Sequence, residues 1–180
     1  MFKLIIDENV ELRMIESNDI KRLYELIDGN RERLKEWFDW PDRVKSESDT
    51  RDYISFIRKN IGLTGHMHAG IWYNEFLIGI ISHQNFKASN ASIAIGYWLD
   101  KDYEGKGIMT RAVKEMISYA FYIGINKVEI FCAVQNSKSR RIPEKLGFVQ
   151  EGIIRGAERL NGEYIDDVIY GILKGEWNED

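Results

Sequence analysis

The chain has 180 residues, of which 44% are apolar and 30% are charged, with a formal net charge of −4. Its length predicts a single domain over residues 1–180, and its slight acidity gives no reason to expect direct binding of nucleic acid. No apolar run approaches the length of about 18 residues that a membrane span needs, and one cysteine excludes an internal disulfide framework or a Cys-based zinc cluster. We expect a cytoplasmic protein that needs no metal and no membrane, and a homo-oligomer, dimer or larger, is compatible with these data.

The first third of the chain predicts one strand and two helices. Residues 12–14 alternate apolar and charged side chains, as a half-buried strand does. A helical pattern over 18–28 ends at Gly29, and a second one over 48–60 stops at Gly62, because glycine often follows the last helical turn.

An aromatic segment separates these two helices. Trp37, Phe38 and Trp40 stand close together before Pro41. They could form a mobile lid that lines a substrate groove. Alternatively, they form a hydrophobic patch beneath the two helices or at a subunit interface.

The rest of the chain predicts a β meander followed by helix–strand–helix–hairpin. Three β-rich runs cover 67–72, 76–84 and 91–99, separated by Asn74-Glu75 and the polar stretch 85–90. The strongest amphipathic helix covers 108–123. The remaining elements are a strand over 128–134, a helix over 138–146 that ends at Gly147, and two strands joined by the turn Asn161-Gly162.

A glycine turn joins the strand 93–99 to the helix that begins at Ile108. Gly105 and Gly107 allow the backbone to approach an anion, and the free N–H groups of the first helical turn can donate to phosphate oxygens. A plain tight turn is the alternative. Other nucleotide motifs fit less well, because Thr110 stands where a dinucleotide fingerprint requires its third glycine.

Two motifs around this turn resemble the GNAT acetyltransferase superfamily, and more narrowly its ribosomal-protein N-acetyltransferase branch. They are Ile95-Gly96-Tyr97-Trp98-Leu99 and Glu104-Gly105-Lys106-Gly107-Ile108-Met109-Thr110, and the similarity continues through Asn136-Ser137-Lys138-Ser139 to the final hairpin. The glycine inside the first motif itself favours a bulge or a close backbone approach.

The resemblance implies a single-domain α/β (α+β) fold with a mixed, mostly antiparallel central sheet that is split in a V and flanked by helices. It implies acetyl-CoA as cosubstrate, held by residues of the strand, the turn and the following helix: Tyr97, Trp98, Leu99, Glu104, Gly105, Lys106, Gly107, Ile108, Met109, Thr110, Asn136 and Ser139. Relatives usually have Gln or Arg at position 104, Gly or Ala at 109 and no proline at 143. Several cations near the turn also suit phosphates: Lys101, Lys106, Arg111, Lys138, Arg140 and Arg141.

Acetyl transfer requires a neutral amine and a proton for the leaving thiolate. Because relatives place the cofactor sulfur near Ser139, this hydroxyl is our candidate proton donor, with a hydroxyl at a helix start as the alternative. Asn136 binds pantetheine by resemblance, or caps the following helix. Strand alternation predicts Cys132 as a packed core thiol rather than a nucleophile.

Glu158, before the Asn161-Gly162 turn, is the candidate base or amine-binding group by resemblance. Asp166 and Asp167 are competing acids that we expect to be solvated or structural. Three histidines, His66, His68 and His83, have no convincing metal-ligand spacing and are expected to be structural.

The pKa of the amine helps to choose the acceptor. An α-amino group has a pKa near 8 and a lysine one near 10.4, so neutralising the lysine costs roughly 3 kcal/mol more. We therefore favour the N-terminus of a protein, such as a ribosomal protein. Acetylation of a polyamine or an aminoglycoside and a non-catalytic acyl-CoA sensor are the alternatives.

Overall fold

A computed structural model describes residues 3–64 and 67–178, with only the backbone of 60–64. The chain divides into two compact units, one formed by 1–82 with 97–108 and the other by 83–96 with 109–180. The strands β4 (Phe76–Lys87) and β5 (Ser92–Leu99) each contribute residues to both units. The single domain stays a prediction.

The first unit contains an antiparallel sheet in the order β1-β2-β3-β4. The strands of this sheet besides β4 are β1 (Lys3–Ile5), β2 (Val10–Met14) and β3 (His68–Tyr73). The helices of the unit are the short η1 (Ser17–Asp19), α1 (Ile20–Leu34), η2 (Pro41–Arg43), α2 (Glu47–Thr64) and η3 (Lys101–Tyr103). The predicted turn between β3 and β4 is confirmed: Asn74 and Glu75 have φ values of 45° and 69°, as tight hairpin turns require.

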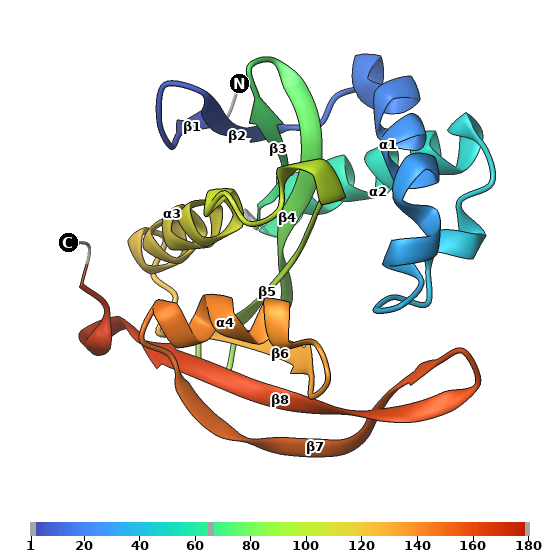
Figure 1. Cartoon of the computed structure of the whole chain (residues 1–180). Helices are drawn as coiled ribbons and strands as arrows, with labels where there is room; N and C mark the ends of the chain where they lie inside the picture. The colour runs from blue at the N-terminus through green and yellow to red at the C-terminus, as the bar shows by residue number, and fades with distance from the viewer. Residues whose placement is uncertain (1–2, 65–66, 179–180) are drawn as a thin grey trace. The chain divides into compact units, whose positions relative to one another are not determined.

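Helices α1 and α2 lie side by side in this unit (Figure 1). They share one core with the sheet, because their apolar faces are buried against it. The core cluster consists of Ile15, Ile20, Leu23, Leu26, Ile27, Ile54, Ile57, Trp72, Leu77 and Ile80. Burial also raises the pKa of Tyr53, packed against this cluster, to about 12.

Both predicted ends of these helices are wrong. Helix α1 runs through Gly29 to Leu34, and α2 runs through Gly62 to Thr64. In α1 the residues beyond the glycine include Asn30, which is 5% exposed, and Leu34, which is 1% exposed. Burial of a leucine side chain is worth about 1.5–3 kcal/mol, which exceeds the cost of about 1 kcal/mol for a glycine inside a helix.

The second unit contains the strand order β5-β6-β8-β7. Its elements after β5 are α3 (Ile108–Tyr122), β6 (Lys127–Ala133), α4 (Ser137–Lys145), β7 (Val149–Leu160), β8 (Glu163–Leu173) and η4 (Lys174–Glu176). Strands β5 and β6 pair in parallel over Ser92–Ala94, whereas β8 pairs antiparallel with both β6 and β7. Figure 1 shows β7 and β8 as one long hairpin.

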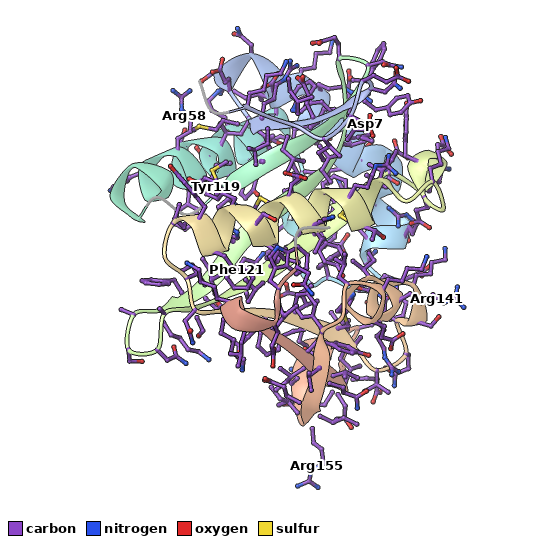
Figure 2. All side chains as sticks on the ribbon, turned by 90° about the vertical axis from the view of Figure 1, so that its left-hand side faces the viewer. Asp7, Arg58, Tyr119, Phe121, Arg141 and Arg155 are labelled. Atoms are coloured by element: carbon purple, nitrogen blue, oxygen red, sulfur yellow. The ribbon has the colours of Figure 1, made fainter. Side chains whose placement is uncertain are left out.

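The predicted elements of this unit are confirmed to within one residue at α3, β6 and α4. The apolar face of α3 is buried as expected, and Gly124 follows it with a φ of 94°. Figure 2 shows Tyr119 and Phe121 on this helix. The α/β fold with a mixed, mostly antiparallel sheet flanked by helices is therefore confirmed. No helix in the described ranges is long and apolar enough to cross a membrane.

Candidate active site

The glycine turn has a left-handed backbone conformation at both of its glycines. Gly105 and Gly107 have φ values of 75° and 71°, and the segment 105–107 is exposed before α3 begins at Ile108. The side chain of Met109 is 8% exposed, so it belongs to the core rather than to the phosphate side. The side chain of this methionine therefore packs away from solvent.

Backbone hydrogen bonds hold the loop that precedes the glycines. The Asp100 amide donates to the Ile78 carbonyl at 2.7 Å, and the Tyr103 amide donates to the Asp100 carbonyl at 3.0 Å. The Lys106 ammonium donates to the Asp102 carbonyl at 3.0 Å and lies over the Tyr103 ring. The loop is thus ordered by its own backbone and by β4.

Arg33 of α1 also binds this loop, which sequence reasoning missed. Its guanidinium lies 2.5 Å from a Glu104 carboxylate oxygen and donates to the Leu99 carbonyl. The two side chains are 71 residues apart in sequence, so only the tertiary fold brings them together. The unusual acid at position 104 is therefore paired with a cation.

The aromatic segment lies against the end of β5. The Trp40 ring is 6.2 Å from that of Trp98 and 5.7 Å from that of Phe38, and both indoles pack against the core of the first unit. Trp37 and Tyr97 are half-buried, and Leu99 is 7% exposed. Trp40, a predicted acceptor residue, and Trp98, a predicted cofactor residue, thus belong to one aromatic cluster. The hydrophobic patch that was the alternative interpretation of the aromatic segment is present as well.

Two glycines permit close approaches of neighbouring strands. A Cβ at Gly79 of β4 would lie 2.5 Å from the Trp98 carbonyl oxygen. A Cβ at Gly96 of β5 would lie 2.4 Å from the Gln84 amide nitrogen. At Gly96 the approaching atoms belong to a side chain, so the bulge and the close backbone approach considered there both stay predictions.

Ser139, Asn136 and Cys132 lie together where β6 leads into α4. The Asn136 carboxamide oxygen accepts a hydrogen bond from the Ser139 amide at 3.1 Å, so the capping role is confirmed. The Ser139 hydroxyl oxygen lies 3.2 Å from the Cys132 sulfur, and this thiol is 4% exposed. Cys132 is the core thiol that alternation predicts.

Arg140 has a structural role. Its Nε donates to the Tyr170 hydroxyl at 3.0 Å, and its Nη1 donates to the Val134 carbonyl at 3.0 Å. The Tyr170 hydroxyl in turn donates to Glu144 at 2.7 Å. The hydrogen bond to Tyr170 raises the pKa of Arg140, and these contacts fix α4 to β6 and β8 rather than presenting a free cation. By contrast, Arg141 projects away from α4 in Figure 2.

The candidate acids lie in three different environments. Glu158 is exposed on β7, next to a shift in the pairing register between Ile154 and Glu158. An Asp166 carboxylate oxygen accepts from the Gly156 amide at 2.7 Å, so this residue is structural. Asp167 is 5% exposed rather than solvated, and burial together with the charge of Asp166 raises its pKa.

The described histidines, His68 and His83, belong to the β3–β4 region of the chain. A ring nitrogen of His83 lies 3.2 Å from the Met116 carbonyl oxygen, and its ring stacks on Tyr119 at 6.1 Å. His66 lies outside the described residues. Among the described residues, no group of three potential His, Cys, Asp or Glu ligands is assembled for a metal ion.

Sequence comparisons link the chain to acetyltransferases. The profile described as "Acetyltransferase (GNAT) domain" matches residues 9–149. The Bacillus subtilis protein named "Putative ribosomal N-acetyltransferase YdaF" is 39% identical over 98% of both chains. The ribosomal-protein-serine acetyltransferase of Escherichia coli is 34% identical over 92% of this chain and 93% of its own.

Two solved structures that are similar to this chain contain acetyl-CoA or coenzyme A. The ribosomal alpha-N-protein acetyltransferase RimL, in a disulfide-linked complex with coenzyme A, has a TM-score of 0.90 at 27% identity over 96% of this chain and 98% of its own. The microcin C7 self-immunity acetyltransferase MccE, in complex with acetyl-CoA and AMP, has a TM-score of 0.89 at 28% identity over 93% of this chain and 94% of its own.

Proposed function

The chain belongs to the GNAT acetyltransferase family and is an acetyl-CoA-dependent N-acetyltransferase, and we propose that its acceptor is the N-terminal α-amino group of a ribosomal protein. The proposal for the acceptor rests on the names of the two relatives at 39% and 34% identity and on RimL. With this acceptor we also propose a cytoplasmic location.

We propose that the amides of Gly105–Thr110 bind the diphosphate of acetyl-CoA. The observation that carries this proposal is the pair of positive φ values at Gly105 and Gly107, on an exposed turn that leads into α3. Glycines in this conformation let the backbone approach an anion closely, and the helix dipole adds to the attraction of the first-turn N–H groups for phosphate.

For the chemistry, the acceptor amine attacks the thioester carbonyl carbon, a C–N bond forms, and the C–S bond breaks. We assign the Ser139 hydroxyl as the donor of a proton to the departing thiolate. The support for this role is the resemblance of the Asn136-x-x-Ser139 stretch to the family motif, and the hydroxyl lies 3.2 Å from the buried Cys132 sulfur. Glu158, directly or through water, takes the proton that the amine loses, and its solvent-exposed position on β7 supports this role.

Trp37, Phe38 and Trp40 are our proposed acceptor-binding residues. The contact between Trp40 and Trp98 supports this role, since it ties the segment to the β5 end that we propose to bind the cofactor. A peptide with a free N-terminus would lie against these rings.

A small-amine acceptor is the second candidate, because a spermidine N(1)-acetyltransferase of Vibrio cholerae is also similar, at 24% identity over 96% of this chain and 97% of its own. The non-catalytic sensor loses its support. Glu104 is paired with Arg33, and Met109 points into the core, so neither departure obstructs the turn.

Release of coenzyme A thiol, measured in parallel with peptides that carry ribosomal N-termini, with spermidine and with an aminoglycoside, tests the acceptor. We expect the highest kcat/KM with one of the peptides and a large loss when its N-terminus is blocked. A higher kcat/KM with spermidine or the aminoglycoside would contradict the ribosomal acceptor.

A further inference from the structure

We infer that Arg33 is a positioning residue for the cofactor: it neutralises Glu104 and fixes the loop that presents the diphosphate-binding amides. This inference rests on the proposed cofactor site. It assigns a specific role in cofactor affinity to a side chain of α1 that lies outside the glycine turn.

The local charge of the loop makes such a residue necessary. Residues 100–107 carry three carboxylates and two ammonium groups, so the loop alone is net negative. The acid nearest to the glycines is Glu104, which directly precedes Gly105. An unpaired carboxylate at this position would repel a diphosphate, because like charges near a protein surface are screened less than they are in bulk water.

Arg33 meets this acid and the loop backbone with the two terminal nitrogens of one guanidinium. Its Nη1 lies 2.5 Å from the Glu104 carboxylate, while its Nη2 donates to the Leu99 carbonyl. Both side chains of the pair are 28% exposed, so water screens their attraction only in part. The arginine thus holds the end of β5 and the start of the glycine turn at the same time.

Asn30 completes this attachment one turn earlier on α1. Its carboxamide oxygen accepts from the Lys101 amide at 3.2 Å and from the Arg33 guanidinium at 3.3 Å. Its amide nitrogen donates to the Leu26 carbonyl at 3.0 Å, which fixes the orientation of the side chain. Two adjacent turns of α1 therefore hold the loop at Leu99, Lys101 and Glu104.

If Arg33 acts by neutralising Glu104, substitutions of these two residues should change the Kd for coenzyme A in opposite directions. Arg33→Met should raise the Kd for coenzyme A about tenfold, because the positive charge that Arg33 places beside Glu104 is then lost near the diphosphate. Glu104→Gln should lower the Kd several-fold, since the positive charge of Arg33 remains. The double variant Arg33→Met/Glu104→Gln should bind nearly as well as the wild type.

A purely structural contact would behave differently, because loss of either partner would then weaken binding. Pantetheine, which lacks the diphosphate, provides a second distinction: Arg33→Met should change its Kd much less than that of coenzyme A. Arg31 is the matched control, because this arginine of the same helix binds the Pro41 and Val44 carbonyls and Asp28 but no residue of the loop. Arg31→Met should reduce stability without a selective loss of coenzyme A over pantetheine.

Titration calorimetry of the full-length chain and its variants with coenzyme A and with pantetheine tests the inference. Equal losses of affinity in both single variants without rescue in the double variant would overturn it, and so would unchanged binding in Arg33→Met. Glu104→Gln retains the arginine, so it tests the sign of the effect even if Arg33→Met folds poorly. Failure of the wild type to bind coenzyme A would instead contradict the proposed cofactor site.

Discussion

The Cys132 sulfur lies 3.2 Å from the Ser139 hydroxyl oxygen, between the end of β6 and the first turn of α4. This pair joins a thiol that sequence alternation places in the core to the hydroxyl that we propose as proton donor. Two experiments follow from the contact, one for each residue.

Removal of the proposed proton donor should slow turnover without weakening cofactor binding. Ser139→Ala should lower kcat about a hundredfold, the size typical of a lost acid catalyst, while the Kd for coenzyme A changes little. Ser137→Ala provides the control, because Ser137 is exposed on the same helix. Steady-state kinetics and calorimetry measure both quantities, and wild-type turnover in Ser139→Ala would remove Ser139 from the mechanism.

Cys132 should react selectively with a disulfide of coenzyme A. If the cofactor sulfur binds beside Ser139, the Cys132 thiolate can attack it, form a mixed disulfide and release one coenzyme A thiolate. Mass spectrometry should detect one bound coenzyme A in the wild type and none in Cys132→Ser. Glutathione disulfide should modify the protein much more slowly, because a thiol that is 4% exposed is otherwise hard to reach. Equal rates for the two reagents would place the cofactor sulfur elsewhere.

The two glycines that flank α3 allow a matched test of the cofactor turn. Gly105 and Gly124 both have positive φ values, 75° and 94°, and a Cβ at either would have no neighbour within 4 Å. Alanine at either position should therefore cost a similar backbone strain of about 1–2 kcal/mol. Only Gly105→Ala should also raise the Kd for coenzyme A, measured by calorimetry. Equal affinities in the two variants would mean that the first turn does not bind the diphosphate.

Trp40 should contribute to stability as well as to the proposed acceptor groove. Trp40→Ala removes an indole that packs on Trp98 and on the core of the first unit, and should lower the free energy of unfolding by about 2 kcal/mol. Phe56→Ala, a control on the exposed face of α2, should change it by less than about 0.5 kcal/mol. Urea denaturation compares the two variants. If Trp40→Phe restores the stability but not the KM for the acceptor, the residue has both roles.

The buried acid Asp167 should make the protein less stable as the pH rises. Its pKa in the folded state is raised by burial and by Asp166, so the folded state holds the proton more tightly than the unfolded state does. Stability is therefore lost as the pH rises from the unfolded pKa of about 3.9 through the folded pKa, and the full cost applies above the folded pKa.

Asp167→Asn removes this cost. Its Tm should exceed that of the wild type at pH 7, and the difference should shrink as the pH falls toward 4. Asp52→Asn, an exposed substitution on α2, should show no such trend in thermal unfolding scans between pH 4 and pH 8. A Tm difference that is constant with pH would contradict a raised pKa at Asp167.

The sequence predicted most strongly those features that depend on neighbours along the chain. The turns at Asn74-Glu75 and Asn161-Gly162, the helix start at Asn136 and the glycine turn are all local, and the structure contains each of them. Their residues adopt conformations that few others accept without cost. Local chemistry therefore identified the candidate cofactor turn.

Long-range packing accounts for what the sequence did not reveal. The end of α1 was wrong because the burial of Asn30 and Leu34 outweighs the local signal of Gly29. Arg33 was missed for the same reason, since its partners lie 66 and 71 residues further along the chain. The burial of Asp167 likewise depends on its place in the sheet. The two adjacent aspartates Asp166 and Asp167 do not show in the sequence which of them is buried.

The pairing shifts in β7 bear on how the chain avoids aggregation. This strand ends the order β5-β6-β8-β7, is 12 residues long, and exposes Val149, Ile153 and Ile154. A regular edge with this composition would invite another strand to pair with it. Two register shifts interrupt its hydrogen-bonding pattern, and Arg155 projects from it in Figure 2. The irregular edge thus favours solubility over strand exchange, so any homo-oligomer of this protein should assemble through another surface.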